Sequence, residues 1–319
     1  MLAAIQITPW HWAGFLAVIV VFLALDLGVF HKESRIVRFR EAMAWTALWF
    51  TLAMGFAAAL VPLRGKEEAV EFFTGYLIEL SLSMDNVFVI ALIFAYFKVP
   101  SAYQHRVLFW GILGALIMRG VLIGAGAALV ERIDWMLYAL GAFLVYTGIK
   151  MMFVDNNDVD PDKNIFVRLA RRLFPISKTF DGQKFTTLTE SGQRALTPLA
   201  LVLVMVETTD LVFALDSIPA IFGITTKKFI VFTSNVFAIL GLRSLYFVLA
   251  GAIEYFRFLK YGLSIVLVFI GVKMLIEYWH IKIPTLLSLG IVAGIILASA
   301  VFSVIAGRRE HAKHPDAAG

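Results

Sequence analysis

Residues Val204 to Phe222 read VMVETTDLVFALDSIPAIF and place three carboxylates, Glu207, Asp210 and Asp216, in a segment that is otherwise apolar enough to lie in lipid. A charged side chain near the centre of a bilayer costs about 2.5–3.5 kcal/mol, so acids in such a segment mark a functional site. This stretch therefore predicts a membrane protein with an ionic site inside the bilayer.

The composition of the whole chain supports the same class. Hydrophobic residues make up 60% of the 319 residues, charged residues make up 16%, and the mean hydropathy is +0.84. A soluble domain averages about half apolar and about a quarter charged residues. Recurring apolar runs of about 20 residues predict an all-α polytopic membrane protein with about nine transmembrane helices. The expected spans are 12–30, 41–62, 71–97, 104–130, 134–153, 195–222, 228–252, 258–278 and 284–306.

Lysine and arginine concentrate in alternate connections between these spans, which sets the expected orientation. The rich segments are 31–40, 98–106, 154–194 and the tail after 306, whereas the other connections carry few basic residues. The N-terminus is therefore expected outside and the C-terminus in the cytoplasm. Because the basic residues lie in loops that set topology, the net charge of +5 does not indicate a nucleic-acid partner.

The long connection 154–194 is expected to be cytoplasmic. Its opening, DNNDVDPDK, resembles a calcium loop, but from Asp158 the sixth position is Lys163 rather than Gly and the twelfth is Leu169 rather than Glu. We interpret it as an acidic solvated turn. Further on, Asp181-Gly182 lies between short β-prone runs and predicts a small hairpin.

The acidic residues belong to an internal repeat. Glu79 is followed six residues later by Asp85-Asn86-Val87, and Asp210 is followed six residues later by Asp216-Ser217-Ile218. Downstream, Arg119 and TGIKMM match Arg243 and IGVKML in the same order. Three spans in each copy force the copies into opposite orientations, as in many secondary transporters. The expected divisions are two N-terminal helices (1–70), the first repeat (71–153), the loop (154–194), the second repeat (195–278), and the last helix with its tail (279–319).

Helical periodicity places only some of these groups together. Glu79 and Asn86, seven residues apart, share a face, and so do Asp210 and Ser217. Asp85 and Asp216 each lie about 120° away from the acid six residues earlier, so either the site is broad or the helices are interrupted, for which Pro219 offers a place.

The ligand types point to a hard cation. The chain has no cysteine, and its six histidines lie at span ends, in loops or in tails, which argues against a zinc or copper site. Carboxylate, amide and hydroxyl oxygens suit Mn²⁺, Mg²⁺ or Ca²⁺. The predicted metal ligands are Glu79, Asp85, Asn86, Glu207, Asp210, Asp216 and Ser217. Arg119 and Arg243 are expected to be counter-charges, and Asp26, Thr208 and Asn235 are candidate pathway residues.

Three segments carry a family resemblance: GYLIELSLSMDNVFVIALIF, VETTDLVFALDSIPAIFGIT and TSNVFAILGLRSLYF. With them, the chain resembles the TerC family over nearly its whole length, and most closely the Alx-like branch. The resemblance implies a bacterial inner-membrane protein linked to Mn²⁺ export, with the acids of both repeats near the ion path.

The sequence thus predicts a manganese exporter that works by alternating access, with protons as the coupled ion and no resident cofactor. The oligomeric state stays open. A membrane scaffold, acting through the 154–194 loop in metal delivery or stress resistance, is the alternative. An intramembrane enzyme is not expected, because the sequence has no H-E-x-x-H motif and no nucleophile–histidine pair.

Overall fold

Ten α-helices and one two-stranded sheet form the part of the computed structural model described here, residues 7–30, 39–133, 135–153, 164–188, 192–249 and 259–313. In chain order the elements are α1 (Pro9–Phe30), α2 (Phe39–Arg64), α3 (Lys66–Tyr96), α4 (Ser101–Arg132), α5 (Met136–Phe153), α6 (Ile165–Leu173), β1 (Thr186–Leu188), β2 (Arg194–Leu196), α7 (Pro198–Phe222), α8 (Lys228–Leu249), α9 (Leu259–Ile276), the 3₁₀ turn η2 (Glu277–Trp279) and α10 (Thr285–Lys313).

Eight helices in these ranges are long and apolar enough to cross a membrane: α2, α3, α4, α5, α7, α8, α9 and α10. The sequence predicts nine spans, and the one that is not among these eight is the first, α1. Helix α1 has 22 residues, and Pro9–Ala24 is the apolar part whose side chains are described. The all-helical polytopic class is confirmed, with eight candidate spans.

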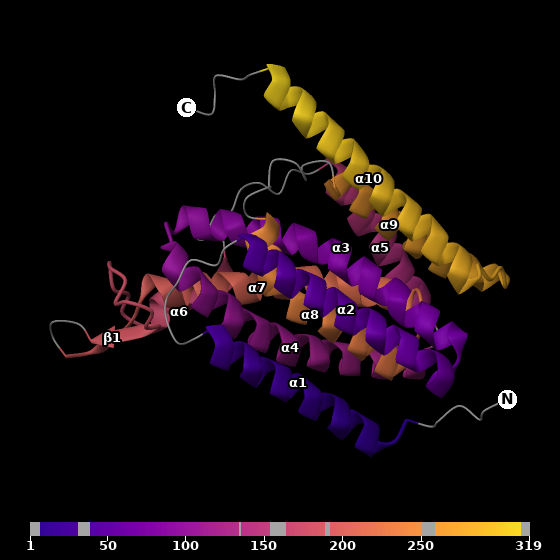
Figure 1. Cartoon of the computed structure of the whole chain (residues 1–319), viewed down its shortest axis with the longest axis horizontal. Coiled ribbons are helices and arrows are strands. Elements are labelled where there is room, and N and C mark those ends of the chain that lie inside the picture. Colours follow the sequence, from indigo (N-terminus) through magenta and orange to yellow (C-terminus); the bar gives the residue numbers. More distant parts are fainter. Residues whose placement is uncertain are drawn as a thin grey trace.

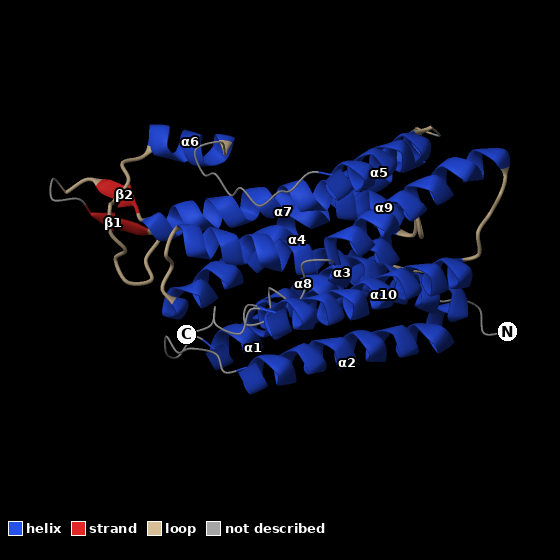
Figure 2. Ribbon diagram, turned by 90° about the horizontal axis from the view of Figure 1, so that it is seen from above, coloured by secondary structure: helices blue, strands red, loops and turns tan. Residues whose placement is uncertain are grey.

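The long helices run side by side along the long axis of the molecule (Figure 1). Viewed from above, α1 and α2 lie on one flank, α5 and α7 lie on the other, and α6 and the hairpin stand at one end (Figure 2). Helix α3 packs on α7 and α8, and α4 packs on α7 and α8, while α5 pairs with α9. Helix α8 is the most enclosed of the candidate spans.

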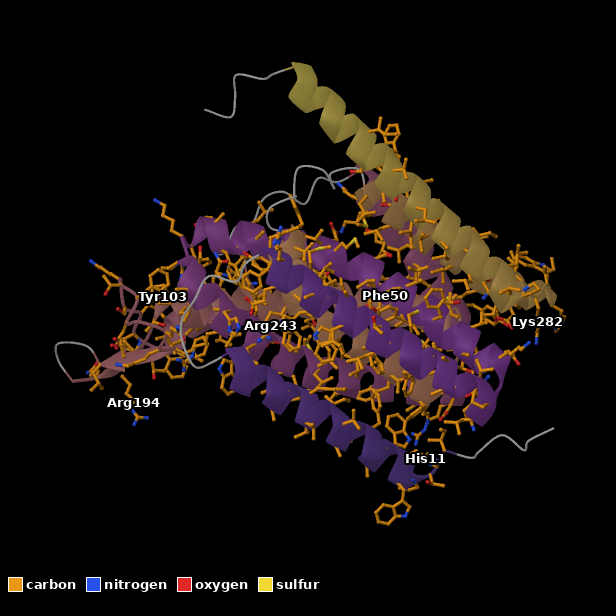
Figure 3. The ribbon with its side chains drawn as sticks, viewed as in Figure 1. His11, Phe50, Tyr103, Arg194, Arg243 and Lys282 are labelled. Carbon is orange, nitrogen blue, oxygen red and sulfur yellow. The ribbon has the colours of Figure 1, made fainter. Side chains whose placement is uncertain are left out.

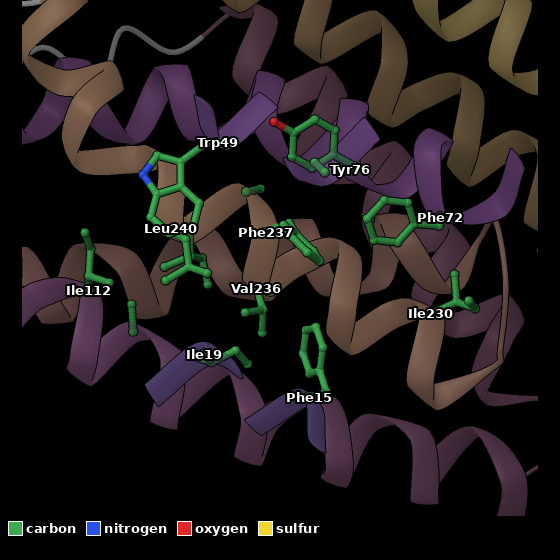
Figure 4. Close-up of a cluster of buried hydrophobic side chains, with 14 of the residues drawn as sticks. Phe15, Ile19, Trp49, Phe72, Tyr76, Ile112, Ile230, Val236, Phe237 and Leu240 are labelled. Atoms are coloured by element: carbon green, nitrogen blue, oxygen red, sulfur yellow. The ribbon is translucent and has the colours of Figure 1, made fainter. Parts of the chain in front are cut away.

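Apolar side chains fill the space on both sides of these central helices. One cluster joins α1, α2, α3 and α8 and is rich in aromatic rings, including Phe15, Trp49, Phe72 and Phe237 (Figure 4). The rings of Phe72 and Phe237 meet edge to face, with centroids 5.8 Å apart. A second cluster packs α3, α4, α7 and α8 toward the hairpin end. Polar groups between these clusters are therefore shielded from water.

The predicted hairpin exists, but its turn differs from the prediction. Strands β1 and β2 pair antiparallel with Thr186 opposite Leu196, so the chain reverses between Leu188 and Arg194. Asp181-Gly182 instead forms a separate turn, in which the Lys184 amide donates to the Asp181 carbonyl at 3.1 Å. Gly182 has φ +54°, a conformation that glycine adopts without strain.

Candidate functional site

Arg119 lies in the middle of α4 and is 2% exposed. It is the largest fully buried side chain among the described residues. Its Nε donates to Asp210 Oδ2 at 3.0 Å, and its Nη2 donates to Asp210 Oδ1 at 2.8 Å. Its Nη1 donates to Glu79 Oε1 and, at 3.3 Å, to Ser217 Oγ. One arginine thus joins α4 to an acid on α3 and an acid on α7.

The side chains that periodicity places on shared faces come together here. Asn86 Nδ2 lies 3.4 Å from Asp210 Oδ1, so Glu79 and Asn86 of α3 meet Asp210 and Ser217 of α7 around Arg119. All four are buried, and Glu79 is 0% exposed. Helix α7 runs through Pro219 to Phe222, so of the two alternatives, a broad site or an interrupted helix, the interruption is not seen in this described segment. We call Glu79, Asn86, Arg119, Asp210 and Ser217 the Arg119 cluster.

The Arg119 cluster carries one formal negative charge, because two carboxylates face one guanidinium. Among the described residues, no three His, Asp or Glu side chains lie close enough to hold a metal ion together. A cation in the cluster would therefore need amide and hydroxyl oxygens beside the two carboxylates.

Several buried polar atoms near these groups have no hydrogen-bond partner in the described part of the chain. On α3 they are Glu79 Oε2, Ser83 Oγ and Asn86 Oδ1, at positions i, i+4 and i+7 of one helical face. Burying an unpaired polar group costs about 1–3 kcal/mol. Three such oxygens on one face therefore lower the stability of the protein. Sequence reasoning missed Ser83, although its spacing between Glu79 and Asn86 was the signal that could have found it.

Asn235 on α8 is also 0% exposed, and neither its Oδ1 nor its Nδ2 has a partner among the described residues. Val231 and Leu242 lie four residues before and seven residues after it, on the same face. Val231 packs with Ile218 and Ile221 of α7, and Leu242 belongs to the cluster that contains Val202 of α7. The Asn235 amide thus faces the centre of the bundle.

Glu207 lies three residues before Asp210 and is half-buried. Its carboxylate rests against the backbone of Gly114 on α4, so closely that a side chain at Gly114 would collide with it. Glycine at position 114 therefore makes room for a third acid between α4 and α7.

The other predicted ligands lie away from the Arg119 cluster. Asp216 is half-buried beside Thr147 of α5 and is attracted electrostatically by Lys150. Asp85 is half-buried and is attracted electrostatically by Lys260 on α9. The Thr208 hydroxyl donates to its own helix at Val204 O, 2.7 Å away. The positions of Asp85 and Asp216 follow the 120° offset expected from helical geometry.

Of the two predicted counter-charges, Arg119 joins the acids and Arg243 lies elsewhere. Arg243 lines a cavity of about 10 Å³ together with Trp45, Trp49, His105 and Phe247, among other residues. Figure 3 labels Arg243 on the side of the bundle nearer the hairpin, whereas Lys282 lies at the opposite end. Asp26 falls in the part of α1 whose side chains are not described.

A second polar network, which sequence reasoning missed, ties α3 to the connection between α7 and α8. Glu71 is 6% exposed, accepts from Thr225 Oγ1 at 2.9 Å and lies 3.1 Å from Lys227 Nζ. Lys227 also reaches Glu68 at 3.5 Å, and Glu68 pairs with Arg64 at 2.7 Å. The acid-rich run KEEAVE after Gly65 was the available signal.

Comparison with known proteins places this arrangement in a family. The chain is 51% identical over 310 residues to "Uncharacterized membrane protein STKORF319" of Myxococcus xanthus, covering 97% of this chain and 96% of that protein. It is 45% identical over 306 residues to the Escherichia coli K12 protein named "Putative membrane-bound redox modulator Alx", covering 93% and 94% of the two chains. No solved structure matches the chain. Residues 64–313, which hold the Arg119 cluster and the second polar network, match the profile of the integral membrane protein TerC family. The chain therefore belongs to the TerC family of integral membrane proteins.

Proposed function

We propose that this protein is a secondary transporter that exports Mn²⁺ from the bacterial cytoplasm across the inner membrane, with its N-terminus outside and its C-terminus inside. The observation that carries the proposal is the Arg119 cluster, a buried site with one surplus negative charge, next to oxygens that have no partner among the described residues. A cation that enters it would meet Glu79 Oε2 and Asn86 Oδ1, which are hard oxygen ligands. The choice of Mn²⁺ over Ca²⁺ or Mg²⁺, and the direction of export, rest on the family resemblance.

The helix contacts support an arrangement of two inverted repeats, α3–α5 and α7–α9. A two-fold axis relating the two repeats would make the contact of α3 with α8 equivalent to the contact of α7 with α4. Both contacts exist. Equivalent helices also meet across such an axis, as α3 with α7, α4 with α8 and α5 with α9. In this proposal, Glu79 and Asp210 lie on the interface between the repeats, where movement of one repeat against the other exposes the ion to alternate sides.

Proton coupling follows from the charge of the cluster. Arg119 is permanently charged, so the ionised cluster keeps one surplus negative charge, which attracts a cation and which a proton on one acid would remove. Protonation of Glu79 or Asp210 from outside would remove that negative charge and weaken the hold on Mn²⁺. We propose that this competition drives release and couples export to inward proton movement.

Two other roles compete with transport. The name of the Escherichia coli relative includes a redox role, but thiol–disulfide exchange requires cysteine and this sequence has none. The scaffold role would depend on the 154–194 segment and not on the buried acids. Deleting that segment would abolish a scaffold function, whereas neutralising Asp210 would abolish transport.

The deciding experiment is Mn²⁺ flux in proteoliposomes, with and without a pH gradient, for the wild type and Asp210→Asn. The substitution keeps the shape of the side chain and leaves Arg119 paired with Glu79, so the cluster becomes neutral and the protein should fold. Asp181→Asn is the matched control, because Asp181 lies in the exposed turn before β1. We expect gradient-dependent flux in the wild type and in Asp181→Asn, and loss of flux in Asp210→Asn. A wild-type protein that is folded and moves no Mn²⁺ under any gradient would refute the transporter.

A further inference from the structure

The short helix α6, IFVRLARRL, has three distinct faces. Val167 is 0% exposed and belongs to the same apolar cluster as Leu199 and Val202 in the first turns of α7. Four other apolar side chains point away from the protein: Ile165 is 68% exposed, Phe166 50%, Leu169 48% and Leu173 63%. Arg168, Arg171 and Arg172 occupy the remaining arc, at helical angles between the other two faces.

Helix α6 packs beside the first turns of α7. Asn164 caps the helix, with its Oδ1 accepting from the amides of Phe166 at 2.9 Å and Val167 at 3.1 Å. Figure 2 shows α6 on the same flank of the bundle as α7, at the end that carries the hairpin. If α7 crosses the membrane from Pro198, its first turns lie near the membrane surface, and α6, packed beside them, lies at the same level.

A helix with an exposed apolar face, an arginine face and no acidic residue has the composition of segments that bind at the bilayer interface. The apolar side chains would enter the boundary of the acyl chains, and the arginines would reach the phosphates. The loop charges assign this end to the cytoplasmic side, where the leaflet is negatively charged. The three positive charges complement that surface.

We propose that α6 is a membrane-surface anchor that binds anionic phospholipid headgroups of the cytoplasmic leaflet and holds this end of the bundle against the bilayer. In this proposal the apolar face of α6 contacts lipid. The alternative, which the experiment below distinguishes, is that it contacts a soluble partner protein. This role is independent of ion transport by the Arg119 cluster.

The absence of cysteine allows a direct test, because a single introduced cysteine can be labelled at one place. Leu169→Cys puts an environment-sensitive fluorophore on the exposed apolar face of α6, and Lys178→Cys puts the same fluorophore on an exposed position beyond the helix. The full-length proteins are reconstituted in phosphatidylcholine liposomes with and without phosphatidylglycerol. Quenching is measured with a lipid-borne quencher and with aqueous iodide.

We expect the label at position 169 to be quenched by the lipid-borne quencher and protected from iodide, and this lipid quenching to rise several-fold with phosphatidylglycerol. The label at position 178 should show the reverse. Replacing Arg168, Arg171 and Arg172 by Gln should remove the effect of phosphatidylglycerol, and replacing them by Lys should restore it. These arginines are exposed, so the variants are expected to fold, which an unchanged melting temperature would verify.

Free access of iodide to position 169 in both kinds of liposome would overturn the proposal. Equal lipid quenching with and without phosphatidylglycerol would overturn the headgroup part of it. Protection of position 169 that appears only when a soluble protein is added would assign the face to a protein partner instead.

Discussion

Arg119 on α4 holds both carboxylate oxygens of Asp210 on α7, with Nε–Oδ2 at 3.0 Å and Nη2–Oδ1 at 2.8 Å. This bidentate geometry is a strong form of arginine–carboxylate contact, and Nη1 donates to Glu79 and Ser217. The cluster is therefore asymmetric: Asp210 is fully engaged with the guanidinium, and Glu79 keeps one oxygen without a partner in the described residues.

Removing the guanidinium should destabilise the protein through charge rather than through packing. Arg119→Gln leaves two buried carboxylates uncompensated and should lower the free energy of unfolding by about 3–5 kcal/mol. Adding Asp210→Asn removes one of those charges, so the double variant should be more stable than the sum of the single effects by about 0.5–3 kcal/mol. Denaturant unfolding in detergent micelles of the four proteins measures this coupling. Strictly additive effects would contradict it.

Asn235 should show a conflict between stability and activity. Asn235→Leu removes a buried amide without a described partner and should raise the free energy of unfolding by about 1–3 kcal/mol while it reduces Mn²⁺ flux. Thr233→Val on the same helix is the control, because the Thr233 hydroxyl is already satisfied by Phe229 O at 2.8 Å. Flux equal to wild type in Asn235→Leu would show that the amide does not serve the ion path.

Glycine 114 should matter for the position of Glu207. Gly114→Ala would put a Cβ within 2.5 Å of Glu207 Oε2, so the flexible carboxylate must move while the backbone stays in place. We expect near-normal stability and reduced flux. Gly124→Ala, on the same helix with no atom within 4 Å of its added Cβ, should leave flux unchanged. Equal flux in the two variants would argue against a role for Glu207.

The α5–α9 contact should tolerate no added side chain. A Cβ at Gly271 would lie 2.6 Å from Gly141 O and 2.9 Å from Val145 N, and backbone atoms cannot give way as side chains do. Gly271→Ala should therefore lower the free energy of unfolding by about 1–3 kcal/mol. Gly290→Ala on α10, with nothing within 4 Å, serves as the reference in the same thermal unfolding measurement.

The sequence was sufficient for the eight helices of membrane length and for the faces of α3 and α7, whereas the short helix α6 was not predicted. Charge in lipid is costly, so the positions of Glu79 and Asp210 were conspicuous, and a 3.6-residue period then paired them with Asn86 and Ser217. The same period placed Asp85 and Asp216 on other faces, as the structure has them. These inferences depend only on local geometry.

The partners of each charge could not be predicted from the sequence. Arg119 and Arg243 are equivalent in the repeat pattern, yet only Arg119 contacts Glu79 and Asp210 in the described structure, and Arg243 lines a cavity near α2. The pairing of Glu71 with Lys227 joins residues 156 positions apart. Such contacts are set by how whole helices pack, and periodicity within one helix carries no information about them.

The charged residues of the Arg119 cluster are synthesised in the order Glu79, Arg119 and Asp210. Glu79 precedes Arg119 by 40 residues, and Asp210 follows it by 91. Synthesis runs from the N-terminus, so α3 and α4, with Glu79 and Arg119, are made before α7. Glu79 and Arg119 alone have no net charge, so the surplus negative charge of the Arg119 cluster exists only once α7 contributes Asp210.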